Sequence, residues 1–583
     1  MIEALCGFII TELLIYSFAL NNNVVYVVMI TMLLTFLLEF FRRNIDIKVK
    51  DSRRLIILNS IFSVFLSFCI LLQTKIQYNG DIAQKLDMEG TFQRFHAIDI
   101  LKFFIAYILV WLGIAAVYFI VEKIKQKKVI QDETIKVINK KDKWKYWAIF
   151  SGVIAVFYII FLFICYPGSV FGDSLNSIWQ VLGTAELSNH FPIFYTWFVG
   201  IFVFIGNCLN NYNIGVALYS LTQILIISGV LGYFILWLKL KGIKTIYLIF
   251  TLFYFIGNSV FATYAICMWK DPLFCLFLFL FMLKLYDIIE SKGKKLDDPF
   301  FVTSIILLNF LVAFLRNNGI FIIILIGIII TICYRKSSKI FLATNIISLI
   351  VIILIQGPLY NVLNIKTPSE ESLGIPIQQV AYTLSVDGEI KEEDKEFLNH
   401  ILPIEDWKDS YEIFLVDSIK WNENFDADFL AQNKLDFIKV WLNGLGNNFP
   451  QYIKAYLLQT YGFWSIGTKN DYGFVNNGIV DNTLGIHKVD LIERFTGLNL
   501  KNWTNNADFL GSGTLIWILF LSGLFLFIQR RGKYTIVLLP CLLLWLSIMI
   551  ATPVAFSLRY VFVLAYALPL IVLLPIIAKK SEQ

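Results

Sequence analysis

The chain has 583 residues, of which 58% are hydrophobic and only 16% are charged. Soluble proteins carry roughly 25% charged residues, so this composition excludes an ordinary soluble protein and predicts an all-α integral membrane protein. The net charge of +6 lies mostly in short loops, where it reports topology, and it does not indicate a nucleic-acid partner.

Apolar runs of about 20 residues recur from end to end, and each is long enough to cross a hydrocarbon core about 30 Å thick. The predicted spans, in chain order, are 3–20, 24–41, 55–73, 98–121, 145–166, 192–209, 213–238, 244–266, 272–288, 299–316, 319–334, 340–358, 513–529, 535–551 and 560–578.

Basic residues gather in a subset of the connections between these spans. Cytoplasmic loops of membrane proteins carry an excess of Lys and Arg, so we place this subset in the cytoplasm. It consists of 42–54, 123–145, 239–244, 292–295, 335–339, 530–533 and Lys579-Lys580. The segments expected to face outward are then 74–97, 167–191, 267–271, 316–318, 359–512 and 552–559.

One stretch breaks the alternation, because two apolar segments separate the outer residues 167–191 from the inner residues 239–244. We expect the first of them, 192–209, to be re-entrant or in-plane, since Pro192 opens it and Gly200 and Gly206 interrupt it. A non-crossing helix is tolerated where protein covers its polar backbone. About fourteen crossings remain, with both termini cytoplasmic in a bacterial plasma membrane.

The spans and loops predict five regions. The outer region is about 150 residues long, enough to bury a modest core, and we expect a mostly helical extracytoplasmic cap. The regions are an N-terminal four-helix membrane segment (1–121), a cytoplasmic basic loop (122–144), a membrane core (145–358), the extracytoplasmic domain (359–512) and the C-terminal transmembrane helices (513–583).

Asp173 lies in a polar stretch, Tyr166-Pro-Gly-Ser-Val-Phe-Gly-Asp173-Ser-Leu-Asn176, directly after a predicted span. Asp271 follows another span on the same predicted face, and its position before Pro272 also suits a helix cap. A carboxylate beside a hydroxyl acceptor is the minimal equipment for general-base glycosyl transfer. Asp173 and Asp271 are therefore the candidate catalytic residues, against the alternative that each is a solvated loop acid.

Three cations are placed outward against the usual bias, namely Lys270, Arg316 and Arg559. Each alone could extend its charged group to lipid headgroups. Together they predict a site for one phosphate anion, because Arg presents a planar fork of donors to phosphate oxygens.

Further polar residues are candidates for acceptor binding or support, and the chain offers no metal-ligand spacing or nucleotide-binding motif. We expect no cofactor and no metal. The eight cysteines lie in or beside apolar segments, as packing residues do. The supporting candidates are Asn176, Asn189, His190, Gln378 and Gln379.

The chain resembles the GT-C superfamily of polytopic membrane glycosyltransferases, and within it an uncharacterised bacterial branch of membrane proteins. The resemblance covers most of 145–578. The residues that carry it are Tyr166-Pro-Gly…Asp173-Ser, Asn189-His190-Phe-Pro192, Lys270-Asp271 and Arg559-Tyr560.

That resemblance implies an active site at the outer face, a polyprenyl-phosphate-linked sugar as donor and Asp173 as the base. It implies that Asp271 is the second outer acid and that Arg559 lies near the donor phosphate. Asp173 is a single acid where some members have an adjacent pair, which favours a metal-independent site and leaves a divalent metal open.

The function expected is a membrane glycosyltransferase that passes a sugar to a glycan, lipid or protein acceptor, in modification of cell-envelope glycans. A lipid-linked glycan polymerase or ligase would share the donor and the outward arginines but would not require an acid in the first outer loop. A transporter or flippase would place ionisable residues near mid-membrane, and the predicted span interiors are almost free of charge. A non-enzymatic receptor with an outer cap is the remaining alternative.

Overall fold

A computed structural model describes residues 2–18, 24–44, 49–76, 92–126, 139–334, 339–366, 370–468, 477–505, 508–551 and 554–579. These residues are helical wherever they are regular, and their β-structure is limited to isolated bridges. Much of the predicted basic loops 123–145 and 335–339, and of the predicted outer segment 74–97, lies outside the described residues.

Seven helices in the described part of the chain are long and apolar enough to cross a membrane, or eight if a bent pair forms one span. Six shorter apolar helices of 10–17 residues accompany them, and the count of about fourteen crossings stays a prediction. The seven long helices indicate a membrane protein. They are Arg53–Gln73, Ala97–Gln126, Lys140–Ile164, Tyr212–Leu240, Lys270–Glu290, Lys339–Val362 and Gly532–Ile550.

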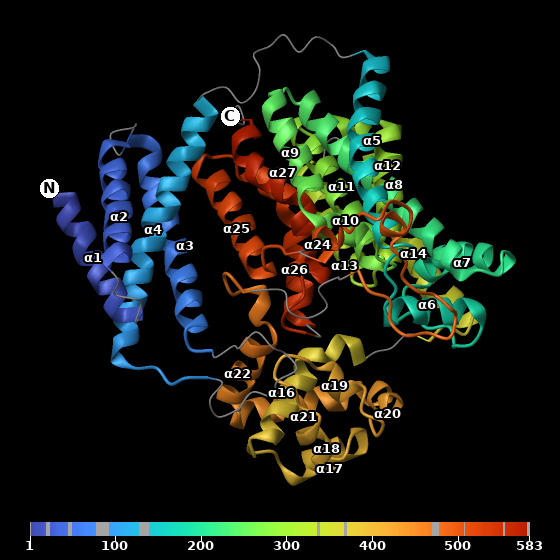
Figure 1. The fold of residues 1–583 in the computed structure, drawn as a ribbon. Helices are drawn as coiled ribbons and strands as arrows, with labels where there is room; N and C mark the ends of the chain where they lie inside the picture. The colour runs from blue at the N-terminus through green and yellow to red at the C-terminus, as the bar shows by residue number, and fades with distance from the viewer. Residues whose placement is uncertain are drawn as a thin grey trace.

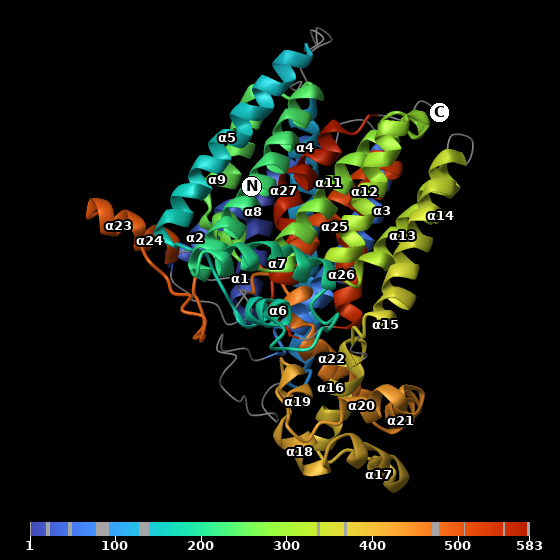
Figure 2. The same ribbon diagram turned by 90° about the vertical axis from the view of Figure 1, so that its right-hand side faces the viewer.

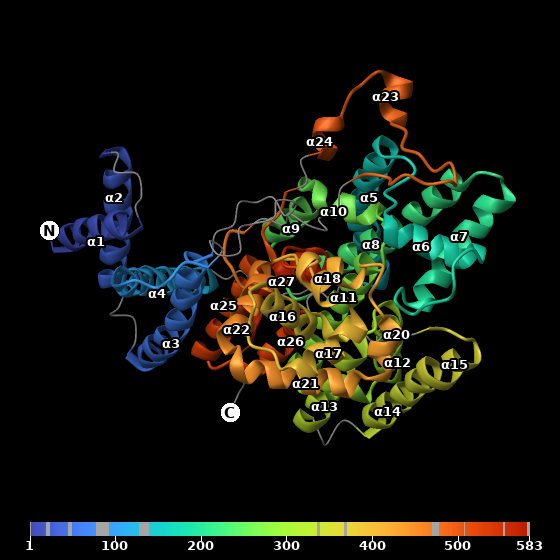
Figure 3. The same ribbon diagram turned by 90° about the horizontal axis from the view of Figure 1, so that it is seen from below.

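The first four helices form a module beside the rest of the molecule (Figure 1). Seen from below, α1 and α2 lie farthest out, whereas α3 and α4 lie next to the body (Figure 3), where α3 contacts α25 and α4 contacts α27. The four are α1 (Ile2–Phe18), α2 (Val24–Asn44), α3 (Val49–Gln73) and α4 (Ala97–Gln126).

The membrane body is built around α11. In its most apolar stretch 83% of the residues are buried, against 22% in the peripheral span Lys339–Val362. A single large apolar core joins α11 to α5, α8, α10 and α27. The helices of the body are α5 (Lys140–Ile164), α6 (Gly172–Leu182), α7 (Ile193–Cys208), α8 (Tyr212–Leu240), α9 (Thr245–Gly257), α10 (Ser259–Ile266), α11 (Lys270–Glu290), α12 (Pro299–Leu315), α13 (Gly319–Cys333), α14 (Lys339–Leu354), α15 (Tyr360–Val362), α25 (Ser512–Ile528), α26 (Leu539–Ile550) and α27 (Val563–Ile577).

Helix α7 lies across the direction of the long helices in both Figure 1 and Figure 2. Its 16 residues would span only about 24 Å, less than the hydrocarbon core. Its aromatic side chains pack on α8 and on the end of α12, where the rings of Phe194 and Phe314 are stacked 4.1 Å apart. Helix α7 thus differs in direction from the long helices, and the expectation that 192–209 does not cross the membrane stays a prediction.

The cap is a separate helical layer below the body (Figure 1) with its own apolar core. Trp407 and Phe437 are fully buried at its centre. The cap helices are α16 (Gly374–Ser385), α17 (Glu392–Ile401), α18 (Ile404–Asp409), α19 (Asp417–Lys420), α20 (Ala427–Gln432), α21 (Lys434–Asn447) and α22 (Phe449–Gln459). Residues 478–505, which we predicted to be part of the cap, instead run along α5 and carry the short helices α23 (Leu491–Thr496) and α24 (Lys501–Asn505).

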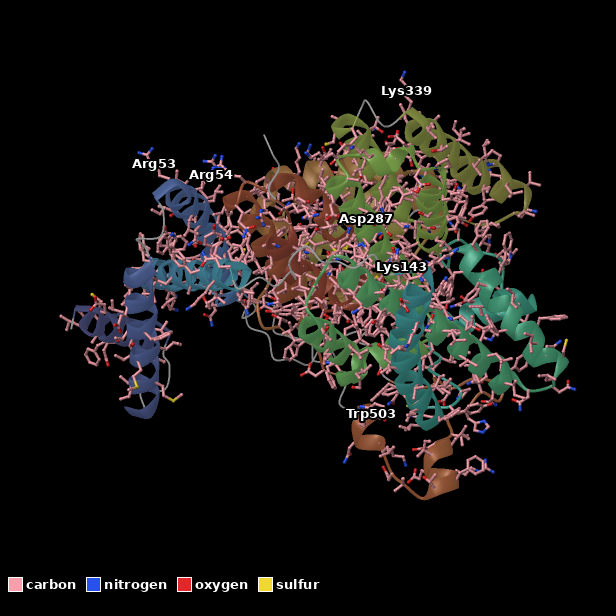
Figure 4. The ribbon with its side chains drawn as sticks, turned by 90° about the horizontal axis from the view of Figure 1, so that it is seen from above. Arg53, Arg54, Lys143, Asp287, Lys339 and Trp503 are labelled. Carbon is pink, nitrogen blue, oxygen red and sulfur yellow. The ribbon has the colours of Figure 1, made fainter. Side chains whose placement is uncertain are left out.

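The basic helix ends lie opposite the cap. Figure 4, viewed from the side away from the cap, shows Arg53 and Arg54, Lys143 and Lys339, which come from three of the predicted basic connections. The charge asymmetry in the sequence therefore corresponds to two opposite ends of the fold. The assignment of the basic end to the cytoplasm stays a prediction.

Small residues permit close contact between α5 and α8. A Cβ added at Gly232 of α8 would lie 2.6 Å from the backbone nitrogen of Ser151 and 2.9 Å from its Cα. Membrane helices use such small residues where their backbones approach closely.

We expect Gly232→Ala to lower the melting temperature of the purified protein, because overpacking of this kind costs about 1–3 kcal/mol. Gly229→Ala, one turn earlier on the same helix, is the matched control, since its Cβ would meet only Trp147 at an ordinary 3.8 Å. Equal melting temperatures for the two variants would contradict the tight contact.

Candidate functional site

The segment before Asp173 is paired with the segment before Asp271. The backbone nitrogen of Ser169 donates to Ile266 O at 3.0 Å, and that of Met268 donates to Ser169 O at 3.0 Å. The Ser174 hydroxyl adds a bond to Met268 O at 2.7 Å. These bonds hold two acids that are 98 positions apart in the sequence at the starts of neighbouring helices, α6 and α11.

The two acids differ in exposure. The Asp271 side chain is fully buried in the first turn of α11, where the positive end of the helix dipole favours a carboxylate, whereas that of Asp173 is 35% exposed. The pair is therefore closed on the side of Asp271 and open to solvent on the side of Asp173.

Arg559 joins the two acids. It lies in a short 3₁₀ turn, Arg559–Val561, directly before α27. Its Nε is 2.7 Å from Asp271 Oδ2, and its Nη2 forms an ion pair with Asp173 Oδ2. Arg316, at the end of α12, approaches Asp271 Oδ1 at 3.0 Å, so the side chains of four separate segments meet in one cluster.

Aromatic rings hold the two guanidinium groups in place. The Cζ of Arg559 is 3.7 Å from the centre of the Trp269 ring, and that of Arg316 is 4.9 Å from the centre of the Tyr560 ring. Such cation–π contacts stabilise a cation most where water is excluded. We did not predict either aromatic as a site residue, although each directly precedes or follows a charged residue that we did.

The cap contributes charged groups at the edge of this cluster. Lys270 Nζ donates to the backbone oxygen of His190 at 3.1 Å. His190 Nδ1 lies 3.5 Å from Glu371 Oε1, which belongs to the cap. Lys420 of α19 lies 3.1 Å from Glu371 and 2.8 Å from Asp417. The three cap residues were not among the predicted site residues, and only the fold brings them here.

The neighbouring charges set the protonation of the exposed groups. Burial would raise the pKa of Asp173, but the Arg559 guanidinium and the Lys270 ammonium more than offset it and hold that pKa below its usual value. Burial and Lys270 together lower the pKa of His190, although Glu371 and Asp173 act in the opposite direction. At neutral pH, Asp173 is therefore an anion and His190 is neutral.

The remaining predicted residues fall into two groups. The side chain of Asn189, next to His190, donates to Asn317 Oδ1 at 3.1 Å, and Asn176 lies one turn after Asp173 on α6. Gln378 and Gln379, by contrast, lie in the interior of the cap. Their amides donate to the backbone oxygens of Glu412 and Tyr452, so the structure does not bring them into the cluster.

The charges in and around the cluster balance. Lys270, Arg316 and Arg559 lie around the two carboxylates, and the cap adds Glu371, Asp417 and Lys420, so four cationic groups face four carboxylates. In the part of the chain that the structure describes, no group of three or more His, Cys, Asp or Glu is placed to hold a metal ion. That the site works without a metal therefore stays a prediction from the sequence.

We expect Asp271→Asn to destabilise the protein strongly. Removing one partner from a buried ion pair costs about 3–5 kcal/mol, and here two arginines lose their shared carboxylate. Asp173→Asn should cost clearly less, because that carboxylate is partly solvated. Thermal unfolding of the purified variants in detergent measures the difference, and equal losses would contradict the central place of Asp271.

Comparisons with known proteins place the chain in a family without adding a described activity. No curated protein and no solved structure matches it. A family model matches residues 7–583, nearly the whole chain, so the protein belongs to a family of unknown function, DUF6020.

Proposed function

We propose that the protein is a membrane glycosyltransferase that moves a sugar from a polyprenyl-phosphate donor to an acceptor on the cap side of the membrane, in modification of cell-envelope glycans. The observation that carries the proposal is the sharing of Arg559 between the partly exposed Asp173 and the buried Asp271. The candidate phosphate-binding group, Arg559, is therefore in direct contact with the candidate base, Asp173.

Arg559 and Arg316 are the groups suited to the donor phosphate. Both side chains are mostly buried, at 11% and 13% exposure, and guanidinium groups bind phosphate oxygens through parallel N–H donors. As the sugar–phosphate bond breaks, negative charge grows on the leaving phosphate, and fixed cations stabilise it at that moment.

Asp173 is the group suited to remove the acceptor proton. In the proposed step, an acceptor hydroxyl forms a bond to the anomeric carbon, its proton passes to the Asp173 carboxylate, and the polyprenyl phosphate leaves with the electrons of the broken C–O bond. A donor phosphate that binds Arg559 competes with Asp173 for the guanidinium. It thereby relieves the charge that lowers the pKa of Asp173 and makes the carboxylate a better base.

Asp271 has a different part in the proposal. It is fully buried and contacts both arginines, so it is a positioning residue that holds the two guanidinium groups for the phosphate. In this proposal the partly exposed Asp173 is the base, and the buried Asp271 positions the arginines.

The first test concerns the base. Deleting the gene should cause a polyprenyl-phosphate-linked sugar to accumulate, as measured by mass spectrometry of lipid extracts. The wild-type gene should restore the normal lipid profile and Asp173→Asn should not. Asp481→Asn, which changes an exposed acid outside the cluster, should behave as wild type. An unaltered lipid profile after deletion, or full rescue by Asp173→Asn, would refute the proposal.

The second test concerns the phosphate site. Asp173→Asn should still retain a polyprenyl-phosphate lipid in native mass spectra of the purified protein, because the arginines remain. Arg559→Gln should retain much less, since it loses the donor fork that faces both acids. Loss of the lipid in both variants would instead favour a binding role for Asp173, and equal retention in both would remove Arg559 from the phosphate site.

A further inference from the structure

Residues 478–505 form a strap along the cap-side ends of two membrane helices. The Val489 nitrogen donates to the backbone oxygen of Tyr166, at the end of α5, at 2.8 Å. The side chain of Asn213, at the start of α8, donates to Gly485 O at 3.0 Å. These bonds tie the strap to the membrane body.

The far end of the strap lies beside membrane helices. Trp503 of α24 packs edge-on against Phe161, in the last turn of α5, with ring centres 5.5 Å apart. Just after the strap, Asp508 O accepts from the side chain of Asn258 at the break between α9 and α10. Figure 2 shows α23 at the left edge of the molecule, beyond α24 and beside the lower end of α5. That end of α5 corresponds to the end of a predicted span.

Three large apolar side chains of the strap are exposed. Phe495, Leu498 and Leu500 are 79%, 60% and 36% exposed, and they lie within six consecutive residues. Single exposed apolar residues are common, but a run of this kind marks an interaction surface. Helix α5, which the strap contacts, also has exposed apolar side chains, Val156 and Phe163 among them, as expected of a helix that faces lipid if α5 spans the membrane.

The net charge of the strap does not favour binding to an anionic membrane surface. Residues 478–505 contain three acidic and three basic side chains, which cancel. Attraction to anionic headgroups therefore contributes little, whereas insertion of apolar side chains at the boundary of headgroups and acyl chains does not depend on net charge. The presence of Trp503 beside them agrees with the preference of Trp for that boundary.

We propose that the strap docks onto the leaflet on the cap side and inserts Phe495, Leu498 and Leu500 among the lipids. The strap also pairs with the loop that leads to Asp173, since Val480 N donates to Val170 O at 3.0 Å. Docking of the strap therefore fixes that loop at the level of the lipid headgroups. The proposal does not depend on the glycosyltransferase function.

The test uses an environment-sensitive dye on single cysteines of the full-length protein in phosphatidylcholine nanodiscs. The exposed Cys6, Cys208 and Cys333 and the partly buried Cys69 are first replaced by Ala. Phe495→Cys is compared with Leu435→Cys, a matched residue that is 75% exposed on α21 of the cap. Lipids that carry a quencher near the headgroup should reduce emission from position 495 several-fold more than from position 435, and aqueous iodide should show the reverse order.

Two results would overturn the proposal. If position 495 responds to both quenchers as position 435 does, the strap lies in water. If position 495 is shielded from both quenchers, protein covers it and not lipid. Both positions are exposed on the surface, so neither cysteine is expected to disturb folding.

Discussion

The ion pairs that Arg559 forms with Asp173 and Asp271 constrain the whole cap-side end of the membrane body. A carboxylate as buried as Asp271 is tolerated only with close counter-charges, and these come from the ends of α12 and α27. The ends of α6, α11, α12 and α27 must therefore remain in register. Loss of that register would leave either a carboxylate or a guanidinium uncompensated at the edge of an apolar core.

The cap takes part in this constraint through the residues just before Arg559. The Ala555 nitrogen donates to Phe414 O at 2.9 Å, and the Gly462 nitrogen donates to Ala555 O at 3.0 Å. Ala555 and Phe556 are buried within the apolar core of the cap. The cap thus fixes the backbone that presents Arg559, in addition to the charged contacts of Glu371 and Lys420 at the rim. A movement of the cap would therefore shift the backbone before Arg559 and with it the position of the guanidinium group.

The sequence predicts the cluster better than it predicts the architecture around it, and the reason is sidedness. The charge bias of the loops assigns Asp173, Asp271, Arg316 and Arg559 to the same side of the membrane. Residues at the same depth can meet through lateral packing of the helices alone, so their contact can be predicted. The pairing of Trp269 with Arg559 depends on the angle at which α27 meets α11, which no local pattern encodes. Gln378 and Gln379 illustrate the opposite failure, because an amide that serves buried backbone groups has the same local sequence signature as one that binds a ligand.

The architecture also shows why the predicted span count is hard to test. Several apolar helices have only 10–17 residues, and α12, α13 and α25 coincide with predicted apolar runs that are themselves shorter than the usual span of about 20 residues. Helix α7 is apolar enough to resemble a span, but it lies crosswise. Its position beside α6 puts an apolar platform next to the polar cluster, which suits the proposed lipid donor. The isoprenoid chain of that donor would need apolar surface at the same level as the groups proposed to bind its phosphate. Polar cluster, crosswise helix and strap all lie at the cap-side ends of the membrane helices, so a single layer of the molecule supplies both.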